Sequence, residues 1–235
     1  MDDLVFPLVL ALDVQSLTMS LVNIASPLGR EGALADSIEA ALRNLTHLEV
    51  ERAGDAVIAR TNAGHDERVI VAGHLDVASE EDPLAYVEMG KLVGPGASDA
   101  KGALAVTLKA AAMPSYSRDV TFIYYAGGQE AAGLSGLGDE LRESDFVLLA
   151  EPTNSAVCSV SGGALDHPWA QRLIGLTDVA PVTDASVAHA RYASLDVHAV
   201  AFGPGDPSVA GTPGEFVPTA QLAQCEFVLR QWLTG

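Results

Sequence analysis

The sequence predicts an α/β fold with a mixed, largely parallel central sheet flanked by helices. Short β-type runs alternate with helical patterns along the chain, which is typical of such folds. Some runs are continuously apolar, as in Arg68-Val-Ile-Val-Ala-Gly, and this indicates strands buried on both faces. The length of 235 residues suits a single core, since cores stop growing near ~250–300 residues. We therefore expect one domain over residues 1–235.

The N-terminal part predicts two helices. Apolar residues form a broad helical stripe over Leu4–Asn23 and recur at three- and four-residue steps over Arg30–Leu45. The apolar stretch Phe6–Leu12 is flanked by acidic residues and no basic segment precedes it. We expect it to begin a buried helix rather than to be a signal peptide. No apolar run approaches the ~18–20 residues that a membrane span needs.

Strands and helices then follow one another to the end of the chain. We expect two hairpins, one that turns at Gly54-Asp55 and one around Met89-Gly90. The expected strands are His47–Arg52, Ala56–Arg60, Arg68–Gly73, the two arms of Val87–Val93, Asp119–Tyr125, Phe146–Ala150 and Val197–Phe202. The expected helices are Ala100–Met113, which Pro114 stops, Leu134–Arg142 and Val217–Leu233.

Composition excludes several kinds of partner. Thirteen Lys and Arg against 31 Asp and Glu give a net charge of −18. A charge of that sign repels phosphate backbones and anionic lipids, so we expect neither a nucleic acid nor a membrane as partner. Two cysteines, Cys158 and Cys225, are too few for a disulfide framework, and we expect a cytoplasmic protein.

Imidazole and carboxylate groups fall where successive expected strands end. These positions are His74 and Asp76, then Asp99 before a helix, then Gln129-Glu130, and finally Glu151. Ligands of such sheets bind beyond the carboxyl ends of the strands. One His with several carboxylates is a donor set that Zn²⁺ accepts, and it also suits a carboxylate-bridged pair of ions.

Each of these residues also has an ordinary structural explanation. A lone His after a strand is commonly a surface or core residue, Asp99 could be an N-cap, and the Glu151-Pro152 pair could simply end a strand. Chance placement at four successive strand ends is the less economical explanation. The pattern therefore favours a metal site.

Five motifs resemble a known family. They are Gly73-His-Leu-Asp76, Gly96-Ala-Ser-Asp-Ala-Lys-Gly102, Gln129-Glu130, Ala150-Glu-Pro-Thr153 and Phe202-Gly-Pro-Gly-Asp-Pro207. In this order and spacing they resemble the co-catalytic zinc amidohydrolases that include succinyl-diaminopimelate desuccinylase, acetylornithine deacetylase and aminoacylase. The resemblance covers most of the chain apart from about residues 166–196. It implies a zinc exopeptidase-like catalytic domain.

The resemblance also implies roles for individual residues. His74 and Glu151 match ligands of a first metal, Asp99 matches a bridging carboxylate, and Glu130 matches a ligand of a second metal. Asp76 matches the acid that orients the His74 imidazole. Lys101 and Gly102 match the helix start behind the bridging carboxylate. The family places a general-base acid immediately before the Glu130 position.

The sequence departs from the family in three places. Gln129 occupies the general-base position, and an amide cannot accept a proton from water. Gly211 stands where the family has the last histidine ligand of the second metal. The family's separate lid and dimerisation domain is missing, and a short connection over about residues 164–196 replaces it. We therefore expect one zinc ion and an impaired second site, for which His167, His189 or His198 could supply a substitute ligand.

Two functional hypotheses remain open, together with a third explanation of the site. The first is a metal-dependent enzyme that acts on an amide or N-acyl amino-acid-like small molecule, by residual hydrolysis or by repurposed Lewis-acid chemistry. The second is a catalytically inactive homologue that binds a metal, a metabolite or a partner protein. Under either hypothesis, absence of the lid domain would expose sheet edge that a second copy in a homodimer or a partner protein could cover. The third is a deliberately inactivated variant, because glutamine is a common laboratory replacement of a general-base glutamate. Joint retention of the acidic residues favours the enzyme, since a cation would compensate their charge.

Overall fold

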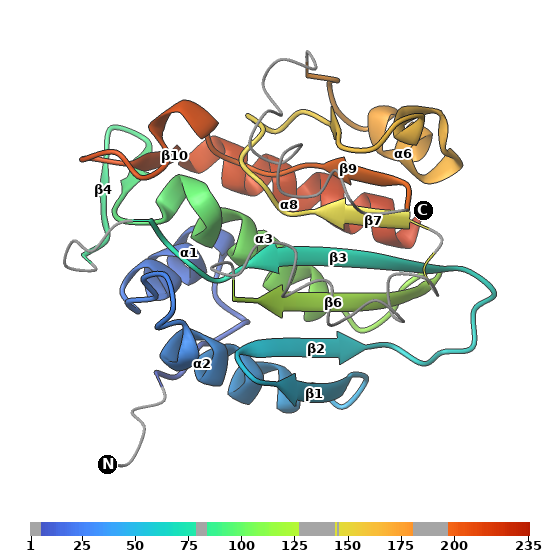
Figure 1. The fold of residues 1–235 in the computed structure, drawn as a ribbon, viewed down its shortest axis with the longest axis horizontal. Helices are drawn as coiled ribbons and strands as arrows, with labels where there is room; N and C mark the ends of the chain where they lie inside the picture. The colour runs from blue at the N-terminus through green and yellow to red at the C-terminus, as the bar shows by residue number, and fades with distance from the viewer. Residues whose placement is uncertain (1–5, 79–83, 127–143, 145, 181–196) are drawn as a thin grey trace.

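The computed structural model describes residues 6–78, 84–126, 144, 146–180 and 197–235. Its main element is a seven-stranded sheet with the strand order β1-β2-β6-β3-β7-β9-β8 (Figure 1). The strands of this sheet are β1 (Glu49–Ala53), β2 (Ala56–Arg60), β3 (Arg68–His74), β6 (Asp119–Tyr125), β7 (Phe146–Leu149), β8 (Cys158–Ser159) and β9 (Ala199–Ala201).

The centre of the sheet is parallel and its borders are antiparallel. Strands β6, β3, β7 and β9 pair in parallel, whereas β1 with β2, β2 with β6, and β8 with β9 pair antiparallel. The predicted mixed, largely parallel α/β sheet is therefore confirmed. Because β3 and β7 are parallel neighbours, the residues that follow their carboxyl ends lie at one edge of the sheet.

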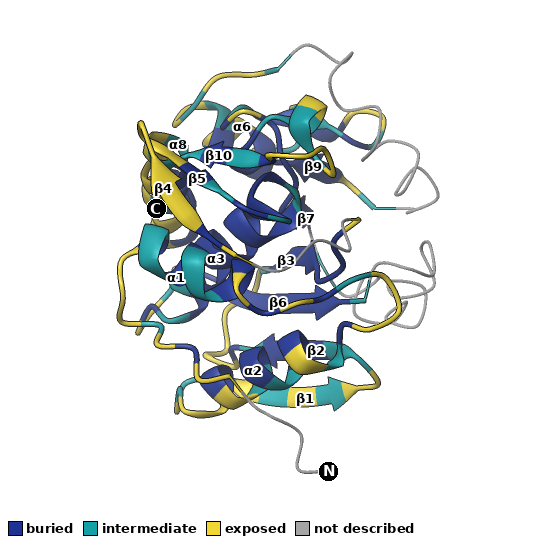
Figure 2. Ribbon diagram, turned by 90° about the vertical axis from the view of Figure 1, so that its left-hand side faces the viewer, coloured by how far each residue is buried: buried dark blue, intermediate teal, exposed yellow. Residues whose placement is uncertain are grey.

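Side chains alternate between two apolar layers along the central strands. In β3, Val69 and Val71 join the larger core, while Ile70 and Ala72 join a second apolar cluster. The larger core also contains the buried faces of the helices α1 (Val14–Val22), α2 (Gly32–Arg43), α3 (Gly102–Ala111), α6 (Pro168–Ile174) and α8 (Thr219–Thr234). Burial of both strand faces explains the continuous apolar runs in the sequence (Figure 2).

A small second sheet lies beside the main one. It has the order β10-β5-β4, with β4 (Tyr86–Glu88), β5 (Lys91–Val93) and β10 (Phe216–Pro218) all antiparallel to their neighbours. The predicted turn at Met89-Gly90 joins β4 to β5, and both residues have positive φ, as tight hairpin turns require. The closing helix starts at Thr219, so the prediction that it starts at Val217 was wrong because β10 occupies that residue.

The predicted long N-terminal helix was also wrong. Helix α1 begins at Val14, because the Asp13 carboxylate accepts a hydrogen bond from the Ser16 N–H at 2.9 Å and caps the helix there. Phe6–Leu12 is non-helical, and Phe6 and Val9 are largely exposed. The apolar composition of this stretch therefore does not reflect a buried helical face.

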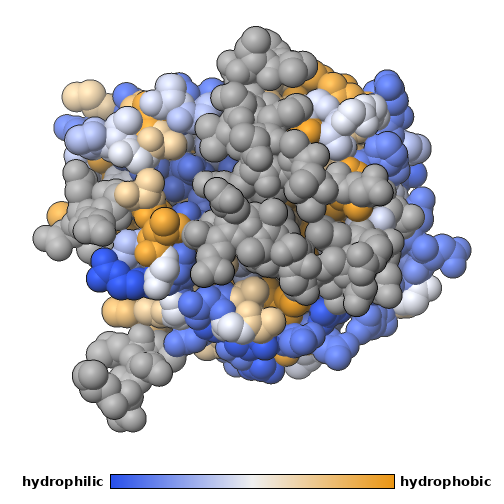
Figure 3. Space-filling model, viewed as in Figure 1, coloured by the Kyte–Doolittle hydropathy of each residue, from blue (hydrophilic) through white to orange (hydrophobic). Residues whose placement is uncertain are grey.

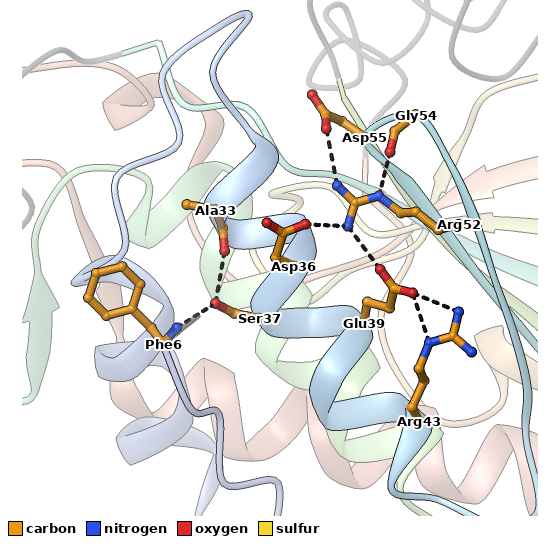
Figure 4. Close-up of polar contacts among 9 residues, drawn as sticks. All are labelled: Phe6, Ala33, Asp36, Ser37, Glu39, Arg43, Arg52, Gly54 and Asp55. Atoms are coloured by element: carbon orange, nitrogen blue, oxygen red, sulfur yellow. Dashed lines mark hydrogen bonds and ion pairs between the residues drawn. The ribbon is translucent and has the colours of Figure 1, made fainter. Parts of the chain in front are cut away.

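A charged network attaches α2 to the β1–β2 hairpin (Figure 4). The Arg52 guanidinium contacts Asp36 at 2.9 Å, Glu39 at 3.3 Å and Asp55 at 3.1 Å, and it donates to the Gly54 carbonyl. Its side chain is only 19% exposed, so these contacts are partly shielded from solvent.

Some predictions concern other parts of the chain. The expected helix Leu134–Arg142 lies outside the described residues. The connection expected over about residues 164–196 includes a short 3₁₀ turn at Ala164–Asp166 and α6. Both cysteines are buried. Within the described ranges, every helix is too short or too polar to cross a membrane.

Candidate metal centre

His74 is the last residue of β3 and is almost completely buried, with 2% of its surface exposed. Its Nδ1 lies 2.8 Å from Oδ1 of Asp76, which is also buried. A carboxylate in this position accepts a hydrogen bond from Nδ1–H, so the lone pair of the neutral imidazole is on Nε2. Nε2 is therefore the nitrogen that is available to a metal.

Two further carboxylates converge on the same nitrogen. Oδ1 of Asp99 lies 2.9 Å from His74 Nε2, and Oε2 of Glu151 lies 4.0 Å from it. All three ligand atoms are within 4.8 Å of one another, and this is the one such group of three among the described residues. Ligand atoms on a tetrahedral Zn²⁺ are roughly 3.3–3.6 Å apart, given bonds of ~2.0–2.2 Å. The two distances from Nε2, 2.9 and 4.0 Å, lie on either side of that value, so the three ligand atoms are near the spacing that a divalent cation requires.

The electrostatics of this group favour a positive charge at its centre. Burial by itself would lower the pKa of His74, but the negative charge of Asp99, the hydrogen bonds to Asp76 and Asp99, and the charge of Glu151 raise it well above the usual value. Three acids around one buried imidazole thus stabilise a cation there, whether a proton or a metal.

The turn at residues 202–207 holds the two carboxylate loops together. A β-carbon on Gly203 would lie 2.5 Å from the Glu151 carbonyl oxygen, so only glycine permits this approach. The Gly203 N–H donates to the Thr153 hydroxyl at 3.0 Å, and the Ser98 hydroxyl donates to the Asp206 carbonyl at 3.0 Å. The glycine-rich motif of the sequence therefore packs against the loops of both Glu151 and Asp99.

Lys101 links the Asp99 loop to the segment that follows α1. Its side chain is buried, and Nζ donates a hydrogen bond to the Ile24 carbonyl at 2.5 Å. Burial lowers the pKa of Lys101 to about 7, and the charge of Glu215 acts in the opposite direction. Glu215 is a buried acid that sequence reasoning missed; a single acid before a short strand carries no recognisable signal.

The structure places the other predicted site residues as follows. Gln129, Glu130 and His189 lie outside the described residues. His198 precedes β9 and its ring is 5.0 Å from that of His167. The register of β3, β7 and β9 puts His198 about five residues before the level of His74, or roughly 16 Å along the strands. His167 and His198 therefore cannot replace a ligand beside His74.

Gly211 lies next to the loop that follows β3. A β-carbon there would be 3.2 Å from the side chain of Ala78, two residues after Asp76. Its backbone is left-handed, with φ +65°, which favours glycine. The position that resembles a histidine ligand in the family thus lies near the centre but offers no ligand atom.

Comparison with curated proteins gives related enzymes. Succinyl-diaminopimelate desuccinylase from Corynebacterium glutamicum is 44% identical over 150 residues, which cover 58% of this chain and 41% of that enzyme. The LysW-lysine hydrolase from Deinococcus radiodurans is 31% identical over 141 residues, covering 57% of this chain and 38% of that enzyme. The chain thus matches less than half the length of these relatives. No family profile matches the sequence.

Solved structures share the fold over nearly the whole chain. An aminopeptidase from the archaeon Desulfurococcus kamchatkensis aligns with a TM-score of 0.71 and 13% identity, covering 94% of each chain. The aminopeptidase PepT from Bacillus cereus aligns with a TM-score of 0.70 and 11% identity, covering 94% of this chain and 97% of that one. At this identity the likeness concerns the fold alone.

Proposed function

The chain is homologous to the family of metal-dependent amidohydrolases and metallopeptidases that includes succinyl-diaminopimelate desuccinylase, and on this premise we propose that it is a single-zinc enzyme. Its substrate would be an amide or N-acyl amino-acid-like small molecule. The observation that carries the proposal is the convergence of His74, Asp99 and Glu151 within 4.8 Å. The desuccinylase name denotes removal of an acyl group from an amino-acid amine, and this supports the substrate class.

Each residue of the centre has a defined task in this proposal. His74 Nε2 and the carboxylates of Asp99 and Glu151 would hold the ion, and Asp76 would keep the imidazole in the required tautomer. When bound, the zinc ion would supply Lewis-acid polarisation of a substrate carbonyl. Gln129 can orient a water molecule by hydrogen bonding but cannot take its proton. Loss of a general base typically lowers the rate ~10²–10⁴-fold, so we expect weak hydrolysis or a reaction that needs no base at this position.

A second candidate is a homologue that binds metal or metabolite without catalysis. Two observations support it. Gln129 replaces the expected base, and Gly211 has a left-handed backbone where the family's histidine ligand is expected. In this case the acidic centre would still hold zinc, and the chain would act through what it binds.

Zinc binding tests the proposal directly. Purified protein is stripped with a chelator, reloaded with zinc and analysed for metal; we expect about one equivalent, and its loss in His74→Ala. His65→Ala, an exposed histidine outside the centre, is the matched control and should bind like the wild type. Absence of zinc from the wild type after reloading would refute the metal centre.

Activity separates the two candidates. Wild type and Gln129→Glu are assayed on a panel of N-acyl amino acids, with and without zinc. Zinc-dependent turnover by the wild type supports the enzyme and excludes the purely binding role. Turnover that appears only in Gln129→Glu would indicate a former hydrolase that now serves as a binding protein.

A further inference from the structure

Glu215 has an unusual set of partners for a single carboxylate. It is 3% exposed and accepts four backbone N–H groups. Oε1 accepts from Ser98 and Asp99, each at 2.9 Å, and Oε2 accepts from Gly96 and Gly211, each at 3.1 Å. One side chain therefore joins the loop that carries the ligand Asp99 to the loop that carries Gly211.

The small sheet fixes where this carboxylate lies. Glu215 immediately precedes β10, in which Phe216 pairs with Val93 at the end of β5. The Gly94 N–H donates to the Glu215 carbonyl at 2.9 Å, so the pairing continues for one more residue. Strand β5 leads directly into the loop of residues 94–99. The pairing of β5 with β10 therefore holds both the start of this loop and Glu215, whose carboxylate accepts hydrogen bonds from the loop.

The contacts constrain the loop conformation. Hydrogen bonds to a charged acceptor are stronger than those between neutral groups, and a buried N–H without an acceptor is destabilising. Three of the four donors belong to residues 96–99, and the last of them is the N–H of Asp99 itself. The Asp99 side chain is only 2.9 Å from His74 Nε2, so a small shift of its backbone would move it out of the ligand group.

We propose that Glu215 is a positioning residue of the metal centre, which holds the backbone of Asp99 so that its carboxylate faces His74 and Glu151. Glu215 acts through main-chain N–H groups. This inference rests on the proposed function, because it assumes that the centre binds zinc.

Glu215→Gln tests the inference with little change of shape. The amide keeps one acceptor oxygen, but its NH₂ group faces two N–H donors in place of the other oxygen. We expect the zinc Kd of the metal-free protein, measured by chelator competition, to rise ~10–100-fold, as for other groups that orient ligands. Glu31→Gln is the matched control, because Glu31 is 1% exposed and accepts the Gly29 N–H at 2.9 Å. It should lose stability but keep the wild-type Kd.

Hydrogen exchange gives a readout that does not need zinc. In the metal-free protein, the Ser98 and Asp99 amides should exchange faster in Glu215→Gln and at the wild-type rate in Glu31→Gln. A Glu215→Gln protein that is as destabilised as Glu31→Gln, but has the wild-type Kd, would overturn the positioning role while leaving the proposed function intact. A wild type that binds no zinc would overturn both.

Folding of the variant is checked by circular dichroism. If Glu215→Gln does not fold, the same measurements are made on Glu215→Asp, which keeps the charge but is one methylene shorter and cannot reach both loops. We expect its zinc Kd to rise about tenfold. An unchanged Kd in Glu215→Asp would overturn the positioning role.

Discussion

At the scale of single residues, Asp76 decides which nitrogen of His74 can bind a metal. The 2.8 Å contact to Nδ1 leaves Nε2 facing Asp99 and Glu151. Because the imidazole is buried, the hydrogen bond also fixes the plane of its ring. In the proposed metal centre, the orientation of the His74 ligand would thus depend on a residue that is not itself a ligand.

Asp76→Ala should therefore weaken zinc binding without removing a ligand. We expect the zinc Kd to rise ~10–100-fold, because the imidazole loses both its tautomer preference and its orientation. Chelator competition measures the change, and Asp66→Ala, which removes an exposed carboxylate, serves as the control. Equal affinities of Asp76→Ala and wild type would show that packing alone orients the ring.

Much of the centre could be predicted from the sequence, for a physical reason. His74 and Glu151 directly follow apolar runs, and the carboxyl ends of parallel strands share one edge of the sheet. Glu215 could not be predicted, because its function depends on backbone N–H groups that only the β5–β10 pairing brings together. Phe6–Leu12 misled because its apolar pattern resembles a helix, while the cap at Asp13 starts the helix later. Gln129 and Glu130 remain predictions.

At the scale of elements, the Arg52 network links α2 to the β1–β2 hairpin through ion pairs. The Arg52 guanidinium forms ion pairs with Asp36 and Glu39 of α2 and with Asp55 in the turn between β1 and β2. Strand β1 is otherwise a partly exposed edge of the sheet. The network therefore restrains the outermost hairpin against the helix that covers it.

Arg52→Ala should lower the free energy of unfolding by about 1 kcal/mol, since exposed pairs contribute little singly but several share this one cation. Urea denaturation measures the change, and it should shrink at high salt because the contacts are partly exposed. Arg230→Ala removes a single pair with Glu226 at 3.2 Å and is the control. An equal loss in both variants would mean that the network adds nothing beyond one surface pair.

At the scale of the whole molecule, acidic residues outnumber basic ones. One of the acids, Asp119, forms hydrogen bonds at the end of the sheet opposite His74. The net charge is −18, and hydrophilic and hydrophobic residues mix on the described part of the face in Figure 3. Asp119, the first residue of β6, accepts hydrogen bonds from the Thr61 hydroxyl at 2.8 Å and from the Ala63 and His65 N–H groups at 2.8 and 3.0 Å. Burial would raise the pKa of Asp119, but these hydrogen bonds and Arg68 outweigh it, so the pKa lies below the usual value.

This shift predicts a pH dependence of stability. A lowered pKa in the folded state means that the Asp119 carboxylate stabilises the fold fully above the unfolded value of ~3.9, and that this stabilisation is lost as the pH falls through the folded value. Asp119→Asn should therefore be about 1–3 kcal/mol less stable than wild type at pH 7, and the difference should shrink below about pH 4. Urea denaturation at several pH values measures it, with Asp66→Asn as the control. A difference that stays constant down to pH 3 would contradict the assignment.

The left-handed backbone at Gly211 limits how readily this chain could acquire a further metal ligand at that position. A histidine at that position would carry a β-carbon into a conformation that costs L-residues about 1–2 kcal/mol, next to Ala78 at 3.2 Å. The Gly211 N–H is also committed to Glu215, so rotating the peptide to relieve the strain would break a contact with the carboxylate that supports Asp99. A single substitution at this position is therefore a poor route to a further ligand, because the loop around residue 211 would first have to be remodelled.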